Sequence, residues 1–532
     1  MMVRFLNTAF SLGLFVERGD IPHAMFAKVC AASVQGIDAF PVEVEVNAGY
    51  GDTICVIVGL PDAAVKESRD RVNTAISNSG FQFLMGRTTI NLAPADIRKE
   101  GPSFDLPIAV GMLGASEQMG PAPLDEWMMV GELALNGAVR PIKGVLSIAV
   151  LAKAQGMKGL IVPAENASEA AVVEGLDVIP VRNLREAVNF LEGEIYIDPL
   201  KVDLETVFGP QGDEEVDLSE VKGQESVKRA LEIAASGGHN ILLIGPPGTG
   251  KSMLAKRIPG ILPPLTLDEA LETTKVHSVV GLLEAGQALV RQRPFRSPHH
   301  TVSDAGLLGG NIHPTPREIS VAHNGVLFLD ELPEFKRNVL ETLRQPLEEG
   351  KVTISRAAGT MTFPSQFMLV AAMNPTPDGK MPHESRSSPR DIERYLGRIS
   401  GPLLDRIDIH IEVPQVKFNE MVNKRPGESS AQVRERVIQA RQIQVKRFAL
   451  RRGINCNARM ASRDLKQHCE LDAPTLDMLK TAMSQLGLSA RAYDRILKVS
   501  RTIADLAGTE QIQADHVGEA IQFRSLDRQI WT

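Results

Sequence analysis

The sequence has few cysteines and no long apolar run. Its four cysteines among 532 residues (Cys30, Cys55, Cys456 and Cys469) are scattered and form no CxxC pair. This distribution argues against a disulfide framework and a cysteine zinc site, and it fits a reducing cytoplasm. No apolar run approaches the roughly 18–20 residues that a membrane-spanning helix requires. We therefore expect a cytoplasmic protein with no membrane partner.

An excess of basic residues is also missing. The formal net charge is −7, so no overall positive field attracts nucleic acid, and any DNA contact must come from local Lys and Arg groups. With 43% hydrophobic and 23% charged residues, the composition is that of an ordinary globular protein. A chain of this length exceeds a single core and indicates about three domains.

The first residues imitate a secretion signal without completing one. Segment 1–24 carries a basic residue and a short apolar patch, but Asn7 and Thr8 interrupt the patch and no A-x-A site follows it. We expect residues 1–24 to be a poorly ordered leader.

The pattern of residues 25–200 predicts a mixed α/β domain. Alternating apolar residues predict a strand around 40–46, ICVIVGL predicts another at 54–60, a helix follows over 62–80, and RTTINLAP restores strand character. Residues 201–217 combine Gly, Pro and acidic residues without periodicity, which is typical of a linker.

The rest of the chain divides into a second α/β domain, 218–418, and a helical domain, 425–532. The apolar runs ILLI, VLFL and FMLVAAM predict buried parallel strands with chemistry at their C-terminal ends. RIDIHIEV (406–413) alternates strictly up to Pro414 and predicts another strand. In the helical domain, a shared helix face is predicted for Ile496, Val499, Ile503 and Leu506.

A phosphate-binding loop follows the ILLI strand and precedes a predicted helix. The loop comprises Gly245, Pro246, Pro247, Gly248, Thr249, Gly250, Lys251 and Ser252. This is the G-x-x-x-x-G-K-[ST] pattern in its required strand–loop–helix setting, so a chance Gly-rich turn is a poor alternative. Backbone N–H groups would surround the phosphates of ATP, Lys251 would face the β- and γ-phosphates, and Ser252 would bind Mg²⁺.

Polar residues follow the next two apolar strands. Asp330 ends VLFL, where it can help to hold Mg²⁺, and Glu331 can orient and deprotonate the attacking water. Asn374 ends FMLVAAM, where its amide can hold that water near the γ-phosphate. The plain alternatives are a strand that ends in two acids and an Asn-Pro turn. The order of these three motifs is that of AAA+ proteins.

Phosphoryl transfer also needs a mobile positive charge near the γ-phosphate. Arg406, at the start of the predicted strand 406–413, suits an arginine finger offered to a neighbouring subunit, and Arg398 is its competitor. Arg491, at the start of a C-terminal helix, is a candidate sensor 2 residue. Each arginine could instead form an ordinary surface ion pair.

Longer motifs give the sequence a close resemblance to the ComM/YifB family of magnesium-chelatase-like AAA+ proteins. They are RPFRSPHH (293–300), GEL (131–133) and LSARAYDRILKVSRTIADL, and the resemblance covers nearly everything from Met25 onward. It implies that RPFRSPHH begins a helix-2 insert and that residues 351–365 form the hairpin before sensor 1. Many family members carry a cysteine-rich segment after the sensor Asn; PTPDGKMPHESRSSPR stands there without cysteine, so we expect no zinc site.

The same resemblance implies a ring, expected to be a hexamer, with ATP and Mg²⁺ between subunits and branched or single-stranded DNA in the pore. The family includes a branch-migration helicase that acts on recombination intermediates during natural transformation. Candidate DNA contacts are His299, His300, Lys351 and Arg356, which would bind phosphates without reading sequence. The alternatives are structural packing for His299 and His300 and a solvated turn residue for Arg356.

The N-terminal domain resembles the Lon protease domain, but a catalytic lysine is missing. KEGPSFDLPIAV (99–110) puts Ser103 at the nucleophile position, whereas Leu146 in PIKGVLSIAV stands where the lysine belongs, with Lys143 three residues earlier. Without a nearby base, Ser103 cannot lose its proton at neutral pH, so we expect a domain that does not cleave peptides. Two other functions stay open: an ATP-dependent protease and a chelatase-like chaperone for metal insertion.

Overall fold

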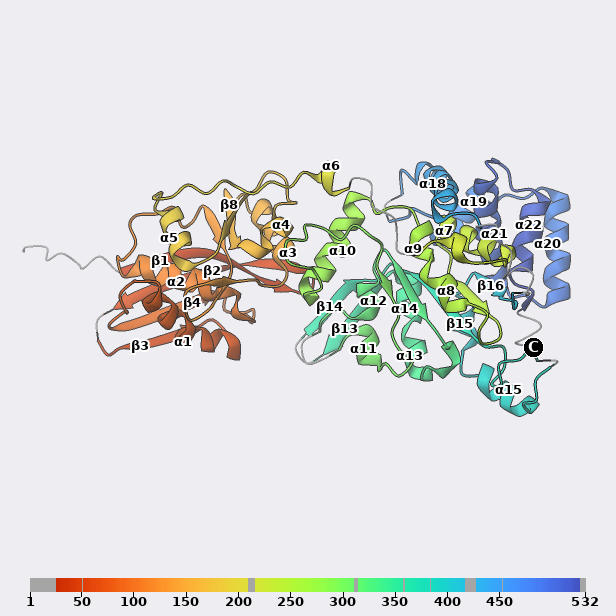
Figure 1. The fold of residues 1–532 in the computed structure, drawn as a ribbon, viewed down its shortest axis with the longest axis horizontal. Coiled ribbons are helices and arrows are strands. Elements are labelled where there is room, and N and C mark those ends of the chain that lie inside the picture. Colours follow the sequence, from red (N-terminus) through yellow and green to blue (C-terminus); the bar gives the residue numbers. More distant parts are fainter. Residues whose placement is uncertain are drawn as a thin grey trace, which may run out of the picture.

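Two β-sheets, one in each α/β region, carry the fold. A computed structural model describes residues 25–49, 51–208, 216–310, 314–356, 359–382, 384–416, 427–451 and 453–526. The expected leader 1–24 lies outside these residues. Figure 1 shows the N-terminal domain, the second α/β domain and the helical domain following one another along the long axis of the molecule.

The N-terminal sheet has seven strands in the order β3-β4-β2-β1-β5-β8-β9, in which β2 runs antiparallel to both of its neighbours. Apolar clusters cover both faces, with α1, α2 and α5 on one and α3 and α4 on the other. The strands are β1 (Met25–Gln35), β2 (Asp38–Gly49), β3 (Ile54–Val58), β4 (Arg87–Ala93), β5 (Trp127–Met129), β8 (Gly159–Pro163) and β9 (Asp177–Val181). The helices are α1 (Ala63–Asn78), α2 (Asp105–Ala115), α3 (Val145–Ala154), α4 (Ala167–Ala170) and α5 (Leu184–Leu191), and β6 (Glu132–Leu133) and β7 (Val139–Arg140) form a separate small hairpin.

The strands and the helix predicted between residues 40 and 94 are confirmed as β2, β3, α1 and β4. In β2 the side chains of Val42, Val44 and Val46 are buried between more exposed neighbours, as the alternation predicted.

The second sheet is parallel throughout, in the order β11-β12-β15-β10-β16. Its strands are β10 (Ile241–Ile244), β11 (Phe295–Arg296), β12 (Val326–Leu329), β15 (Met368–Met373) and β16 (Ile409–Glu412). The three apolar runs are confirmed as β10, β12 and β15, which are buried on both faces because helices cover each side. Parallel strands end at one edge, so the residues that follow β10, β12 and β15 come together there.

Helices and one hairpin surround this sheet. The helices are α7 (Glu225–Gly237), α8 (Lys251–Lys256), α9 (Ile258–Ile261), α10 (Leu267–Val280), α11 (Asp304–Leu308), α12 (Glu318–Val321), α13 (Arg337–Thr342), α14 (Arg344–Glu349), α15 (Pro389–Leu396) and α16 (Gly401–Leu404). The hairpin expected at 351–365 is confirmed as β13 (Lys351–Arg356) and β14 (Gly359–Pro364).

The strand predicted over 406–413 is only partly correct. β16 begins at Ile409, and Arg406 lies in the turn after α16. Of the four polar residues of the alternation, Arg406, Asp408 and His410 are buried and Glu412 is exposed. The cause is tertiary: Asp408 pairs with Arg495 of the C-terminal domain, and the His410 N–H donates to the carbonyl of Phe523.

The C-terminal domain is helical, as predicted. It contains α18 (Ser430–Arg447), α19 (Ser462–His468), α20 (Ala473–Leu486), α21 (Ala490–Leu506) and α22 (Ala514–Gln522). The predicted apolar face of α21 is confirmed, because Ile496, Val499 and Ile503 are buried and Leu506 packs against the same cluster. None of the helices in the described ranges is long and apolar enough to cross a bilayer.

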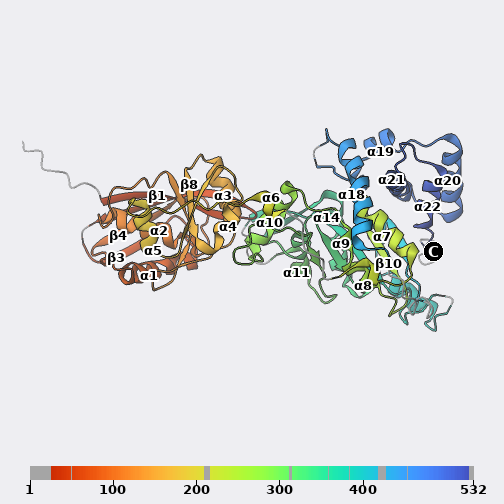
Figure 2. The same cartoon turned by 45° about the horizontal axis from the view of Figure 1, so that its top comes forward.

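Helix α10 of the second domain docks on the N-terminal domain. Both views place α10 beside α3 and α6 (Figures 1 and 2). Gly144 donates its N–H to Ser278 Oγ at 2.9 Å, and Leu271 and Leu289 pack against the cluster on α3. The predicted linker 201–217 contains the short helix α6 (Leu204–Val207), whose apolar residues join this cluster, while 209–215 lie outside the described residues.

Candidate nucleotide site

The conformation of the loop after β10 requires glycine at two positions. Gly245 approaches β16 so closely that a Cβ atom would lie 2.4 Å from the carbonyl oxygen of Val413. Gly250 has φ of +88°, a left-handed conformation that lets α8 begin at Lys251. The sequence therefore shapes a loop whose next residues, Lys251 and Ser252, start a helix beside the ends of β12 and β15.

Lys251 occupies the centre of this loop. Its ammonium group donates to the carbonyl oxygens of Gly245 at 2.7 Å and Pro246 at 2.9 Å, and to Asn374 Oδ1 at 3.2 Å. Burial lowers the pKa of Lys251, although the carboxylates of Asp330 and Glu331 act in the opposite direction. A cation held on the loop's own oxygens is suited to exchange them for the more negative oxygens of a phosphate.

Ser252 and Asp330 meet where a metal ion would be held. The Ser252 hydroxyl donates to Asp330 Oδ2 at 2.6 Å, so two oxygen ligands from different elements converge. Hard oxygen ligands of this kind suit Mg²⁺, which usually takes its remaining ligands from phosphate and water. The pair fits a magnesium ion that arrives with the nucleotide and neutralises charge on its phosphates.

Glu331 stands next to this pair in an unusual backbone conformation. Its φ is +53°, in the left-handed region that non-glycine residues seldom adopt, and its N–H donates to Asp330 Oδ1 at 3.0 Å. The side chain is 57% exposed, and its Oε2 lies 3.1 Å from Nδ1 of His300. A solvent-facing carboxylate at this position could accept a proton from an attacking water.

Two further side chains, which the sequence did not reveal, hold the loop and Asn374 in place. Gln224 donates through its amide to the carbonyls of Thr249 at 2.9 Å and Pro414 at 2.7 Å, and so ties the loop to the end of β16. The Tyr395 hydroxyl donates to the Asn374 carbonyl at 3.3 Å, and burial raises the pKa of Tyr395 to about 12. No local motif marks either residue; only the fold brings them here.

Two of the three candidate arginines, Arg406 and Arg491, lie away from this loop, whereas Arg398 contacts Pro333 and Glu334, which follow Glu331 closely. The Arg406 backbone carbonyl accepts a hydrogen bond from the Asn240 side chain, and Asn240 directly precedes β10. The phosphate-binding loop follows β10, so the four residues of this strand, about 13 Å in length, separate the Arg406 backbone from the loop. The Arg406 side chain is buried and pairs with Glu348. Arg491 pairs with Asp405 at 3.0 Å, at the same edge as Arg406. Arg398 is more exposed and pairs with Glu334 at 2.8 Å.

The four candidate DNA contacts do not form one group. Lys351 and Arg356 lie at opposite ends of β13, and Arg356 donates to the Gly310 carbonyl at 3.2 Å. His300 points to Glu331 instead. The rings of His299 and His300 lie 4.1 Å apart between centroids.

In the N-terminal domain, the position expected for a catalytic lysine lies in a buried contact with the second domain. Leu146 is fully buried, and its N–H donates to Glu169 Oε1 at 2.8 Å. Ser278 of α10 donates to the same carboxylate oxygen. Lys143 extends away along Gly281 of the second domain, where a Cβ atom would lie 2.7 Å from its Cε.

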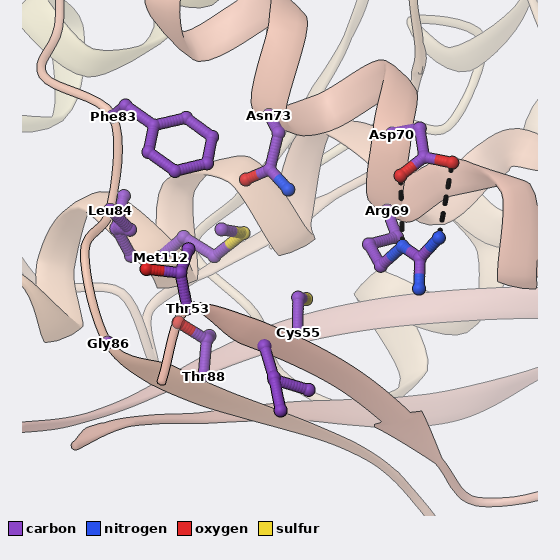
Figure 3. Close-up of a pocket in the computed structure, with 11 residues that line it drawn as sticks. Thr53, Cys55, Arg69, Asp70, Asn73, Phe83, Leu84, Gly86, Thr88 and Met112 are labelled. Carbon is purple, nitrogen blue, oxygen red and sulfur yellow. Dashed lines mark hydrogen bonds and ion pairs between the residues drawn. The ribbon is translucent and has the colours of Figure 1, made fainter. Parts of the chain in front are cut away.

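A hollow between β3, β4 and α1 of the N-terminal domain contains none of the predicted site residues (Figure 3). Its volume is about 320 Å³, and the charges at its edge, Arg69 and Asp70, pair with each other at 2.9 Å. Burial raises the pKa of the Cys55 thiol in its wall, so that thiol is a poor nucleophile.

Comparison with known proteins agrees with this arrangement. The competence protein ComM of Haemophilus influenzae is 46% identical over 506 residues, which cover 94% of this chain and 98% of that protein. The chain belongs to the ComM/YifB family. YifB of Escherichia coli is 46% identical as well, over 93% of this chain and 96% of its own length.

Partial matches identify the domains of this ComM/YifB protein. The family described as "Magnesium chelatase, subunit ChlI" matches residues 217–421, its C-terminal part matches 427–524, and "Subunit ChlI of Mg-chelatase" matches 42–166. Lon protease 2 of Bacillus subtilis is 33% identical over 136 residues, which cover 25% of this chain and 23% of the protease. The second domain is therefore a magnesium-chelatase-like AAA+ domain, and the N-terminal domain is Lon-like.

Proposed function

We propose that this protein is an ATP hydrolase that works as a ring-shaped DNA motor and promotes branch migration. The ring is supported by one observation: the nucleotide-site residues and the candidate arginines Arg406 and Arg491 lie at different edges of the sheet. Lys251, Asp330 and Glu331 occupy one edge of the sheet, whereas Arg406 and Arg491 occupy the other. In this proposal the site is completed by an arginine from a neighbouring subunit, in a head-to-tail ring.

Within that ring each side chain has a role. Lys251 binds the β- and γ-phosphates, Ser252 and Asp330 hold the magnesium ion, and Asn374 positions the water. Glu331 accepts a proton from that water, and the partner's arginine balances the charge that develops on the phosphate. Arg406 leaves its contact with Glu348 to do so. Hexamer formation is part of the proposal and follows the family resemblance.

The DNA part rests on the likeness to a competence protein and on the hairpin β13–β14. One face of the hairpin buries Val352, Ile354 and Phe363, while Lys351 and the hydroxyls of Thr353 and Ser355 remain exposed. Hydroxyl and ammonium groups bind DNA phosphates without reading sequence. We propose that this face follows the DNA backbone in the pore.

The proposal is tested by the ATPase rate with four-way junction, single-stranded and duplex DNA, and by migration of the junction. We expect junction DNA to raise turnover by about fivefold or more, the usual size of a coupling between two ligands. Lys251→Ala should abolish turnover in every condition. An ATPase that no form of DNA stimulates would refute the DNA motor.

A second candidate is a chelatase-like chaperone, because the three family matches carry the magnesium-chelatase name. It predicts ATP-dependent metal insertion into a tetrapyrrole and no response to DNA. Proteolysis is the weakest candidate, because Leu146 is buried beneath Glu169 and Lys143 extends toward Gly281. Labelling of Ser103 by a serine-directed probe would revive it.

A further inference from the structure

A two-residue turn of the Lon-like domain lies against the hairpin β13–β14 of the AAA+ domain. The turn consists of Gly36 and Ile37, because β1 and β2 remain paired up to Gln35 and Asp38. Gly36 has φ of +70°, which a tight hairpin turn requires at its first position and which glycine adopts without strain. Figure 1 shows β1 and β2 extending from their own domain toward β14.

The contact is apolar and falls on the inner face of the hairpin. A Cβ atom at Gly36 would lie 3.7 Å from Cε1 of Phe363 and 4.0 Å from Sδ of Met361, both in β14. Ile37 packs against the cluster that contains Phe363 and the two buried residues of β13, Val352 and Ile354. Part of the apolar cover of the hairpin therefore comes from a different domain.

The turn is held in place from both domains. The buried Ser147 of α3 donates its hydroxyl to the Ile37 carbonyl at 2.6 Å. On the other side of the turn, Asp38 forms an ion pair of 4.0 Å with Lys275 of α10. Because α3 and α10 form the contact between the two domains, the turn has a fixed position relative to the hairpin.

The hairpin needs such support, because β13 and β14 form a separate two-stranded sheet. A sheet of two strands has little stability of its own, so its orientation depends on what covers its apolar face. The outer face is polar and exposed: hydroxyl pairs, each 3.0 Å between oxygens, join Thr353 with Thr362 and Ser355 with Thr360. The two faces therefore divide the work, one for packing and one for solvent or a ligand.

We propose that Ile37 is a positioning residue for the hairpin β13–β14, and that the Lon-like domain uses it to hold the polar face of the hairpin ready for DNA. A hairpin that is already ordered binds phosphates without the cost of being ordered at that moment. This inference rests on the proposed function and adds a role for the Lon-like domain, which supports the DNA-binding hairpin from behind.

The test removes the support and measures the hairpin and the DNA response separately. Without DNA, we expect Ile37→Ala in the full chain to speed hydrogen exchange of the β13 and β14 amides by about fivefold or more, measured by mass spectrometry. The DNA-free kcat and the KM for ATP should change by less than about twofold, whereas the junction DNA concentration for half-maximal stimulation should rise about fivefold. Ile37→Val keeps a branched apolar side chain and should stay within about twofold of the wild type in every measurement.

Ile54→Ala is the matched control, because Ile54 is exposed on the edge strand β3 of the same domain and should affect neither the hairpin nor the DNA response. If Ile37→Ala does not fold, Met361→Ala removes the contact from the side of the hairpin and should give the same changes. Unchanged exchange in β13 and β14, equal effects of Ile37→Ala and Ile54→Ala, or an unchanged DNA requirement in a DNA-stimulated enzyme would overturn the proposal. Faster exchange in a protein that no DNA stimulates would uphold the support of the hairpin and refute the DNA motor alone.

Discussion

At the scale of single residues, Lys251 has the position that we expect of a phosphate-binding lysine. Its ammonium group reaches three oxygens from two elements, and burial already lowers its pKa. Lys256 lies on the same helix but is exposed. The two lysines therefore provide a matched pair, one inside the site and one outside it.

We expect Lys251→Ala to weaken binding of MgATP by about 100-fold, because charged hydrogen bonds of this kind contribute about 1.5–3 kcal/mol each. Lys256→Ala should bind nearly as the wild type does. Titration calorimetry of both variants measures the difference directly. Equal affinities for the two would move the nucleotide away from this loop.

The sequence allowed us to predict those residues of the candidate site that directly follow an apolar strand. The loop after β10, Asp330 after β12 and Asn374 after β15 follow apolar runs of four to seven letters that fix their place at one edge of the sheet. Gln224 and His300 have no such marker, because they arrive through tertiary packing. The sequence assigned His300 to DNA, and the fold places it against Glu331.

At the scale of elements, the junction between β16 and the C-terminal domain is a buried polar network. His239, after α7, places Nδ1 2.9 Å from Asp408 Oδ2 and Nε2 2.8 Å from Thr502 Oγ1 of α21. Arg495 of α21 pairs with Asp408 from the other side at 2.9 Å. Alternation along 406–413 could not reveal this network, because a strand pattern does not say which domain covers its polar side.

This network predicts how stability depends on pH. Burial lowers the pKa of His239 in the folded protein. Below the unfolded-state pKa of about 6.5, this histidine is therefore protonated in the unfolded chain while it is still neutral in the folded protein. Stability should therefore fall as the pH drops from 7.5 to 5.5, by up to about 1.4 kcal/mol per pH unit for this group. His239→Asn should be less stable at pH 7.5 but should show a shallower pH slope in urea unfolding. A slope equal to that of the wild type would mean that His239 is protonated in the folded protein.

At the scale of the whole molecule, the Lon-like domain contacts the AAA+ domain at the start of α3, where Leu146 stands at the position expected for a catalytic lysine. Glu169 binds the start of α3 and Ser278 of α10 together, and α10 also reaches the segment before β12, where Thr273 accepts a hydrogen bond from Asn324 at 3.2 Å. The helix α10 thus connects the start of α3 with the segment before β12, the strand that Asp330 follows. This arrangement suits a domain retained for assembly.

A ring also predicts that two inactive variants restore ATPase activity when they are mixed. Arg406→Ala keeps an intact loop, and Lys251→Ala keeps an intact arginine, so a mixed ring contains interfaces where each supplies what the other lacks. In equal mixtures about one interface in four is complete, and turnover should return to roughly a quarter of the wild-type rate if the sites act independently. Arg398→Ala serves as the comparison, because Arg398 is exposed on a different contact with Glu334. If Arg398→Ala is inactive alone and restores turnover with Lys251→Ala, while Arg406→Ala remains active, then Arg398 is the finger and buried Arg406 only holds α14 through Glu348.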